Sequence, residues 1–320
     1  MPVRARFDTA QAAWFRLPPN SRGAIWLLCN AVVSTVLIVL VRMVGQDIPT
    51  IQLVFIRAAV GVMLILPVVL RMGVTSALRT DHIAMHGVRA MFTFVSMNCF
   101  YYAYSVLPLA DATAMIFTMP LFLLVLAVAF LGERVGWRRA SATLAGFLGV
   151  VVMLRPGQAA FDPVLLVALA IGFFDACVAV VVKKLSGTEK PVTIIFYMAA
   201  FTLLFASIPA WFAWQPVSLE QLVLILLIAV TTTISQIFTV FAWRVGETTA
   251  IAPFNYTQLI FAAGAGFLLF AELPDAYTWT GAAIIIGSTL YIMRREARLK
   301  RRGAAIAEDR PSTGPVPPRV

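Results

Sequence analysis

The sequence predicts an all-α, polytopic membrane protein with ten transmembrane helices in two five-helix repeats of inverted topology. The composition, the spacing of apolar runs and an internal repeat support this prediction. The chain of 320 residues is 61% hydrophobic and only 12% charged, whereas soluble domains carry about 45–50% apolar and about 25% charged residues. So few charged groups cannot cover a globular surface, which argues against a soluble enzyme and against a disordered chain.

Ten apolar runs follow one another along the chain, separated by loops too short to form an extramembrane domain. A bilayer core of about 30 Å requires roughly 20 apolar residues in a helix. Backbone groups in hydrocarbon must be satisfied within their own segment, so each run is expected to be helical. The predicted spans are 24–44, 49–70, 84–106, 109–131, 137–154, 162–184, 191–213, 219–243, 248–270 and 277–293.

These spans divide the chain into four parts. Residues 1–23 form a cytoplasmic tail, and 24–154 and 162–294 form the two five-helix repeats. Residues 295–320 form a basic cytoplasmic tail that is expected to be disordered. The first apolar run, 24–44, is too long for the core of a signal peptide, so we expect it to remain as a span.

The positions of Lys and Arg predict the orientation. With the N-terminus in the cytoplasm, 22 of the 25 basic residues fall in inner segments, and only Arg42 and Arg155 fall in outer ones. This excess predicts that both termini are cytoplasmic, in a multi-pass protein of a bacterial inner membrane. The net charge of +10 is therefore a topology signal rather than a nucleic-acid-binding surface.

The two halves of the chain are similar at an offset of 139 residues. At this offset Ser96 meets Ser235, and Glu133 at the end of span four meets Glu272 at the end of span nine. Because each half has five spans, the second half is inserted upside down relative to the first. Inverted repeats are typical of secondary transporters, whose substrate site lies near the midplane where the halves meet.

Two long segments carry a resemblance to a known family: FYYAYSVLPLADATAMIFTMPLFLLVLAVAFLGERVGW and TTAIAPFNYTQLIFAAGAGFLLFAELPDAYTWTGAAIIIGS. Over residues 22–295 the chain resembles the EamA-type ten-helix transporters of the drug/metabolite transporter (DMT) superfamily. The stretches DACVAVVVKK and TAIAPFNYTQL look most like the branch with S-adenosylmethionine and riboflavin transporters. The family usually has a proline in the middle of span nine, matching Pro120 of span four, but this chain has Gln258 and Leu259 there.

Three charged residues lie within predicted spans: Arg57, Arg89 and Asp175. A charge at the centre of a bilayer costs about 2.5–3.5 kcal/mol or more, so each side chain must face protein or water. One interpretation is a site or gate, in which Asp175 binds a cation or proton and an Arg binds a carboxylate or phosphate. The alternative is a structural ion pair, or an Arg89 side chain that extends to the membrane surface. The resemblance carries an Arg at the position of Arg57.

Polar and aromatic residues at helical spacing predict the lining of a central cavity. The stripe in span three contains Arg89, Thr93, Ser96, Phe100 and Tyr104, and the matching stripe in span eight contains Thr232, Gln236, Thr239 and Trp243. A third face in span nine contains Asn255, Tyr256 and Gln258. The alternative is that these groups form hydrogen bonds between packed helices.

Other motifs are less specific. Glu133 and Glu272 are expected either to pair and pack at helix ends or to form a gate. His82 and His86 are four residues apart but lack a third ligand beyond Asp81, so no metal site is predicted, and no cofactor is expected. The small-residue faces of spans five and ten, at 142–146 and 283–287, are expected to pack within the bundle or at a dimer contact.

Together these features predict a secondary transporter that works by alternating access and is not an enzyme. The resemblance implies a small organic substrate such as S-adenosylmethionine, riboflavin or an amino-acid-like solute. The expected partners are this metabolite and the lipid bilayer, with protons as a candidate driving ion and no nucleic acid. Monomer and homodimer both remain open, as do two alternative functions, a polytopic membrane enzyme and a passive channel or scramblase.

Overall fold

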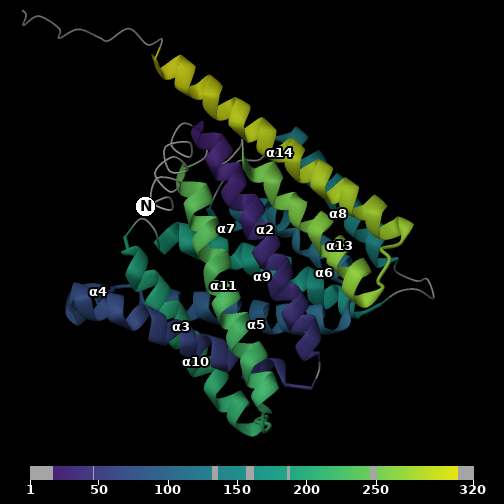
Figure 1. Ribbon diagram of the computed structural model, residues 1–320. Coiled ribbons are helices and arrows are strands. Elements are labelled where there is room, and N and C mark those ends of the chain that lie inside the picture. Colours follow the sequence, from purple (N-terminus) through teal and green to yellow (C-terminus); the bar gives the residue numbers. More distant parts are fainter. Residues whose placement is uncertain are drawn as a thin grey trace, which may run out of the picture.

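The computed structural model describes residues 17–45, 47–131, 136–155, 162–185, 188–245 and 251–308, and every element in these ranges is helical (Figure 1). The first half contains α2 (Pro19–Val44), α3 (Thr50–Met72), α4 (Val74–Leu78), α5 (Ile83–Val106), α6 (Leu109–Ile116), α7 (Met119–Leu131) and α8 (Trp137–Leu154). The second half contains α9 (Val164–Leu185), α10 (Pro191–Phe212), α11 (Leu219–Val245), η1 (Ala252–Tyr256), α13 (Thr257–Phe270) and α14 (Ala276–Glu308).

These helices confirm the predicted ten-helix fold. Within the described ranges, 6 helical stretches are long and apolar enough to cross a membrane, and 140–154 and 254–270 are shorter apolar stretches. The more polar α5 and α14 complete the set of ten. Span four consists of α6 and α7, and span nine consists of η1 and α13, while α4 occupies the connection between spans two and three.

Much of the apolar surface of these helices is not covered by protein. Only 17% of the most apolar window of α11 and 22% of that of α3 is buried. Leu64, Ile208 and Leu268 are among the large side chains that remain exposed. Exposure to water would cost about 25 cal/mol for each Å² of apolar surface, whereas lipid tails are as apolar as these side chains. The fold therefore requires a bilayer.

The packing of the helices repeats between the two halves. α2 packs against α11 and α13, and its counterpart α9 packs against α5 and α7. α3 packs against its own counterpart α10, and α8 packs against its own counterpart α14. The set of contacts stays the same when the two halves are interchanged, as expected for two equivalent repeats. Each half thus places its first helix among the helices of the other half, and Figure 1 shows α2 running beside α11.

Spans four and nine are interrupted at equivalent positions. Thr118, between α6 and α7, donates a hydrogen bond from Oγ1 to the carbonyl oxygen of Met115 at 2.6 Å. Thr257, where η1 passes into α13, donates to the carbonyl oxygen of Phe254 at the same 2.6 Å. The two threonines lie 139 residues apart, so both copies have kept the same local bond. Span nine is thus interrupted although residues 258–259 do not include a proline.

The two interruptions meet at the centre of the fold. Phe117 and Tyr256, which precede the two threonines, pack edge to face with ring centroids 4.9 Å apart. These residues are also equivalent at the offset of 139. Two equivalent residues can contact each other only close to the axis that relates the two copies, so this aromatic pair marks the pseudo-twofold axis.

α8 and α14 cross closely where two glycines meet. A Cβ atom on Gly281 would lie 2.7 Å from the carbonyl oxygen of Gly149, and one on Gly149 would lie 2.9 Å from that of Gly281. The predicted faces are used differently: a Cβ on Gly146 would meet Leu121 of α7, and one on Gly287 would meet no described atom within 4 Å. The close crossing of Gly149 with Gly281 therefore lies one turn from Gly146 on α8 and two turns from Gly287 on α14.

The C-terminal helix is longer than predicted. The sequence predicted a span ending at residue 293 and disorder from 295, but α14 continues to Glu308. The added segment consists mainly of Arg and Ala, which have high helix propensity, and it extends a helix that is already formed. Residues 309–320 lie outside the described ranges, as do residues 1–16 of the N-terminal tail.

We predict that Gly281→Ala lowers the stability of the protein by about 1–3 kcal/mol, because the new Cβ would press on the backbone of α8. Thermal unfolding in detergent measures the effect. Gly287→Ala on the same helix is the matched control, since its Cβ would enter open space. Equal melting temperatures for the two variants would contradict the close crossing of α8 and α14.

Candidate functional site

A polar cluster joins three helices in the middle of the bundle. Asp175 lies at the centre of α9, and its Oδ1 accepts a hydrogen bond of 2.6 Å from Oγ of the buried Ser96 on α5. Arg57 on α3 interacts electrostatically with Asp175 and hydrogen-bonds with the Tyr101 hydroxyl. The structure thus brings together Arg57, Ser96 and Asp175, which the sequence had singled out separately, and it adds Tyr101.

The carboxylate of Asp175 keeps a free acceptor. Its second oxygen, Oδ2, has no hydrogen-bond partner among the described residues, yet protein does not enclose it. An unpaired carboxylate oxygen facing lipid would be expensive, so this oxygen must face water or a solute. A mid-membrane acid with one oxygen held by a serine and the other available can bind a cation or accept a proton.

Asp175 also lies beside the interruption of span four. Gly172, one turn before Asp175 on α9, packs so closely on this interruption that a Cβ there would lie 2.5 Å from Oγ1 of Thr118. Interrupted helices near the membrane midplane typically form solute and ion sites in transporters. The polar cluster and the interrupted helix therefore form one candidate site.

The other residues of the predicted stripe on α5 make contacts outside this cluster. Arg89 is buried and donates from Nη1 to the carbonyl oxygen of Ile194 on α10 at 2.8 Å, so it ties the halves together. Thr93 bonds back to its own helix. Tyr104 is fully buried and its hydroxyl lies 2.9 Å from Oγ1 of Thr113 on α6. Phe100 packs against Tyr104, with centroids 4.7 Å apart.

On α11, the side chain that contacts α2 is Ser235, which is not one of the predicted cavity-lining residues. Thr232 and Thr239 bond to carbonyl oxygens of their own helix, and Gln236 is exposed. The side chain of Trp243 lies outside the described part of the chain. Ser235 makes the interhelical contact instead, and its equivalence to Ser96 is the signal that could have identified it.

The face of span nine contributes mainly through one residue. Tyr256 packs against Phe117 and its hydroxyl interacts with Thr289 of α14. Asn255 and Gln258 are half-buried on η1 and α13.

At the predicted outer end of the bundle, a carboxylate joins the two halves. Glu272, just after α13, accepts 2.8 Å from Nη2 of Arg42 on α2 and 2.9 Å from the backbone N–H of Leu109 at the start of α6. Arg42 also donates to the carbonyl oxygen of Ser105. A carboxylate at a helix N-terminus is favoured by the unpaired N–H groups there. Glu133, the counterpart of Glu272, lies outside the described residues.

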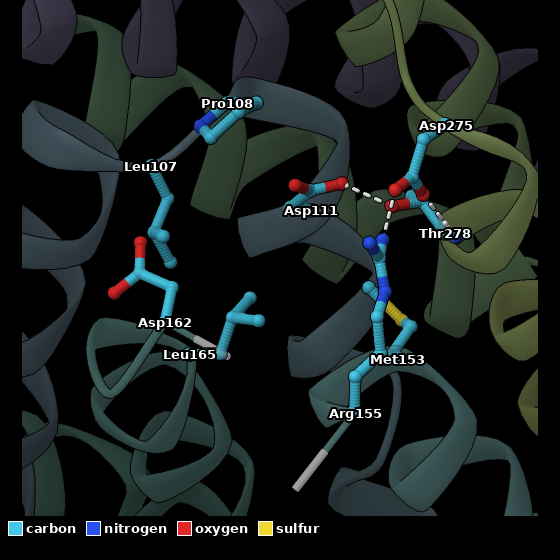
Figure 2. A pocket seen from close by; sticks show the side chains of 9 residues that line it. All are labelled: Leu107, Pro108, Asp111, Met153, Arg155, Asp162, Leu165, Asp275 and Thr278. Carbon is cyan, nitrogen blue, oxygen red and sulfur yellow. Dashed lines mark hydrogen bonds and ion pairs between the residues drawn. The ribbon is translucent and has the colours of Figure 1, made fainter. Parts of the chain in front are cut away.

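A pocket of about 240 Å³ opens next to this contact, and charged side chains approach each other across it (Figure 2). Arg155, which follows α8, forms an ion pair with Asp275 before α14, and Asp111 of α6 accepts 2.7 Å from Oγ1 of Thr278. Burial alone would raise the pKa of Asp275, but hydrogen bonds from the Thr278 amide and Arg155 together lower it. Asp275 is therefore ionised at neutral pH and holds Arg155.

Comparison with protein-family models matches the chain twice. The model of the EamA-like transporter family matches residues 21–155 and again residues 162–294. A crystal structure of another protein, 16% identical in sequence, superimposes with a TM-score of 0.57 over 88% of this chain and 99% of the other. At that identity the structural likeness supports the fold alone.

Three characterised relatives align over most of their length. The S-adenosylmethionine uptake transporter of Rickettsia prowazekii is 31% identical over 86% of this chain and 94% of its own. The riboflavin transporter of Vibrio cholerae is 29% identical over 89% of this chain and 97% of its own. The pseudopaline exporter of Pseudomonas aeruginosa is 28% identical over 85% of this chain and 96% of its own.

We predict that Glu272→Ala weakens closure at the outer end, because Arg42 and the first amide of α6 both lose their acceptor. Leu107 is buried and lines the pocket beside this contact. A Leu107→Cys probe, in a background without the native cysteines, reports closure through its labelling rate with a membrane-impermeant maleimide. We expect labelling to become about tenfold faster, which corresponds to one charge-assisted hydrogen bond.

Glu220→Ala is the matched control, because Glu220 is an exposed acid in the first turn of α11 on the same predicted side. If Glu272→Ala and Glu220→Ala give the same labelling rate, the carboxylate of Glu272 does not hold this end closed.

Proposed function

Because the chain belongs to the EamA-like transporter family, we propose that it carries a small organic metabolite across a bacterial inner membrane by alternating access. The relatives support the class of solute: they are named for S-adenosylmethionine, riboflavin and pseudopaline. These solutes share a medium size and a combination of ring or aliphatic surface with polar groups. Neither the relatives nor the described site supports an enzymatic role.

The observation that carries the proposal is the cluster around Asp175. It places a carboxylate with a free oxygen, an arginine and aromatic rings at the seam between the two halves. An ammonium or sulfonium group would be attracted to Asp175, and a carboxylate to Arg57. Phe100 and the Phe117–Tyr256 pair, which are only partly buried, supply flat surfaces for a ring.

Alternating access requires that the two ends close in turn. The bonds of Glu272, Arg155 and Asp111 join first-half helices to the second half at one end, and we expect them to break when that end opens. With both termini in the cytoplasm, this is the outer end.

Protons are the proposed driving ion. Asp175 is a mid-span acid with an accessible oxygen, and it can exchange a proton for a cationic group of the solute. The sequence contains no nucleotide-binding motif, which supports a gradient as the energy source. A monomer contains the complete cluster, so dimer formation is not needed to build the site.

We predict saturable movement of labelled S-adenosylmethionine or riboflavin into proteoliposomes that contain the purified protein. The solute recovered from the lumen must be chemically unchanged, and empty liposomes serve as the control. Uptake that does not saturate would favour a channel, and a modified product would favour a membrane enzyme. Uptake at the level of empty liposomes for both solutes would contradict the proposed substrate class.

We predict that Asp175→Asn abolishes accumulation driven by a pH gradient while leaving exchange of solute down its own gradient. The amide keeps an acceptor for Ser96 but cannot take up or release a proton. Thr93→Val is the matched control, because Thr93 lies on the same cluster helix but bonds only to its own backbone. If Asp175→Asn still accumulates solute against its gradient, Asp175 is not the coupling residue.

A further inference from the structure

A second polar cluster lies between α2 and α11, apart from the cluster around Asp175. Oδ1 of Asn30 accepts a hydrogen bond of 2.7 Å from Oγ of Ser235. The hydroxyl of Ser34 lies 3.0 Å from that of Ser235 and donates weakly to Oδ1 of Asn30 at 3.5 Å. We call Asn30, Ser34 and Ser235 the amide cluster.

The amide cluster is the structural copy of the cluster around Asp175. α2 and α9 both end six residues before the next helix begins, α2 at Val44 and α9 at Leu185. Aligning these ends places Ser34 at the position of Asp175. Ser235 is already the equivalent of Ser96, so the Ser235–Ser34 contact repeats the Ser96–Asp175 contact on the other side of the pseudo-twofold axis.

The surroundings of the two clusters are also equivalent. α9 packs against α5 and the interrupted span four, and α2 packs against α11 and η1 of the interrupted span nine. If the pathway runs along the seam between the halves, symmetry brings it past both clusters. A feature that gives one cluster access to the pathway therefore gives access to the other.

The chemistry of the two clusters differs. Asp175 and Arg57 make one of them charged, whereas the equivalent positions in the other copy are Ser34 and Met198. Asn30 has no polar counterpart, since its equivalent is Ile171. One side of the seam therefore offers charges, and the other offers only uncharged hydrogen-bonding groups.

Asn30 keeps a free donor. Its Oδ1 receives both serine hydroxyls, but its Nδ2 donates to none of the described residues and is not enclosed by protein. An amide N–H₂ in mid-membrane with neither a protein partner nor protein cover must face water or a solute. The two serines hold the oxygen of the amide and so aim its N–H₂ group away from the α2–α11 contact.

We propose that the amide cluster is a second solute subsite, in which Asn30 donates to an uncharged acceptor of the solute while Asp175 binds the cationic part. This proposal rests on the proposed transport function. It assigns the substrate class more narrowly: a metabolite with an uncharged polar ring or amide at one end, whose affinity increases when the other end carries a cation. Ser34 and Ser235 are positioning residues.

The test compares KM and kcat for uptake of S-adenosylmethionine, a cation with a neutral adenine ring, and of riboflavin, which has no cation. Asn30→Leu removes the donor at similar volume and is expected to raise KM about tenfold for each probe that the unmodified protein carries. Asp175→Asn is expected to raise KM about tenfold for S-adenosylmethionine, and for riboflavin by no more than about threefold.

Two further variants separate binding from packing. Thr35→Val removes a hydroxyl on α2 that bonds only to Ala31 of its own helix, and it should leave KM unchanged. Ser34→Ala removes a contact with Ser235 but retains Asn30. It should lower the melting temperature about as much as Asn30→Leu does, and change KM by no more than about threefold.

The amide cluster is only an interhelical contact if Asn30→Leu gives the same KM as Thr35→Val, or if Ser34→Ala shifts KM as much as Asn30→Leu does. Either result overturns the subsite while the transport function stands. If the unmodified protein carries neither probe, the proposed substrate class fails and the subsite fails with it.

Discussion

The carboxylate of Asp175 in the middle of a membrane-spanning helix is the constraint from which the arrangement of the central helices follows. Such a charge is expensive in hydrocarbon unless protein or water faces it. Its partners, Ser96 and Arg57, come from helices of the other half of the chain. α9 must therefore lie among first-half helices, and the equivalence of the two repeats requires α2 to lie among second-half helices. The exchange of first helices joins the halves into one bundle.

The interruptions of spans four and nine show how backbone polarity is handled at this seam. A helix broken within a membrane exposes N–H and C=O groups that lipid cannot satisfy. Thr118 and Thr257 each bond back three residues, and the breaks are then covered by the contact of Phe117 with Tyr256. Because the threonine bond is local, it survives in span nine although the position that matches Pro120 is Leu259. The breaks are thus built into both copies by the same residue type at the same position.

The sequence was sufficient for the fold, because long hydrophobic runs are strong signals that tertiary packing does not override. It also identified Arg57, Ser96 and Asp175, since charges within spans are rare. It could not decide where a polar side chain has two equally plausible partners. Tyr104 and Thr93 have the composition of cavity-lining residues, and their hydroxyls bond nearby, to Thr113 and to the backbone. Asn30 and Ser34 were overlooked because single small polar residues in an apolar run carry no signal until their partner across the seam is known.

Duplication and divergence have separate roles in this molecule. The duplicated backbone supplies two equivalent polar positions, on α2 and α9, each within reach of a serine on the neighbouring helix. Keeping an acid at both would place two carboxylates at one seam in a medium of low dielectric, where like charges repel strongly and are poorly solvated. With Ser34 at the position equivalent to Asp175, the seam carries one carboxylate at these two positions. An uncharged Ser34 beside Asn30 is the outcome that preserves the interhelical contact, and it gives a symmetric scaffold a chemically polarised interior.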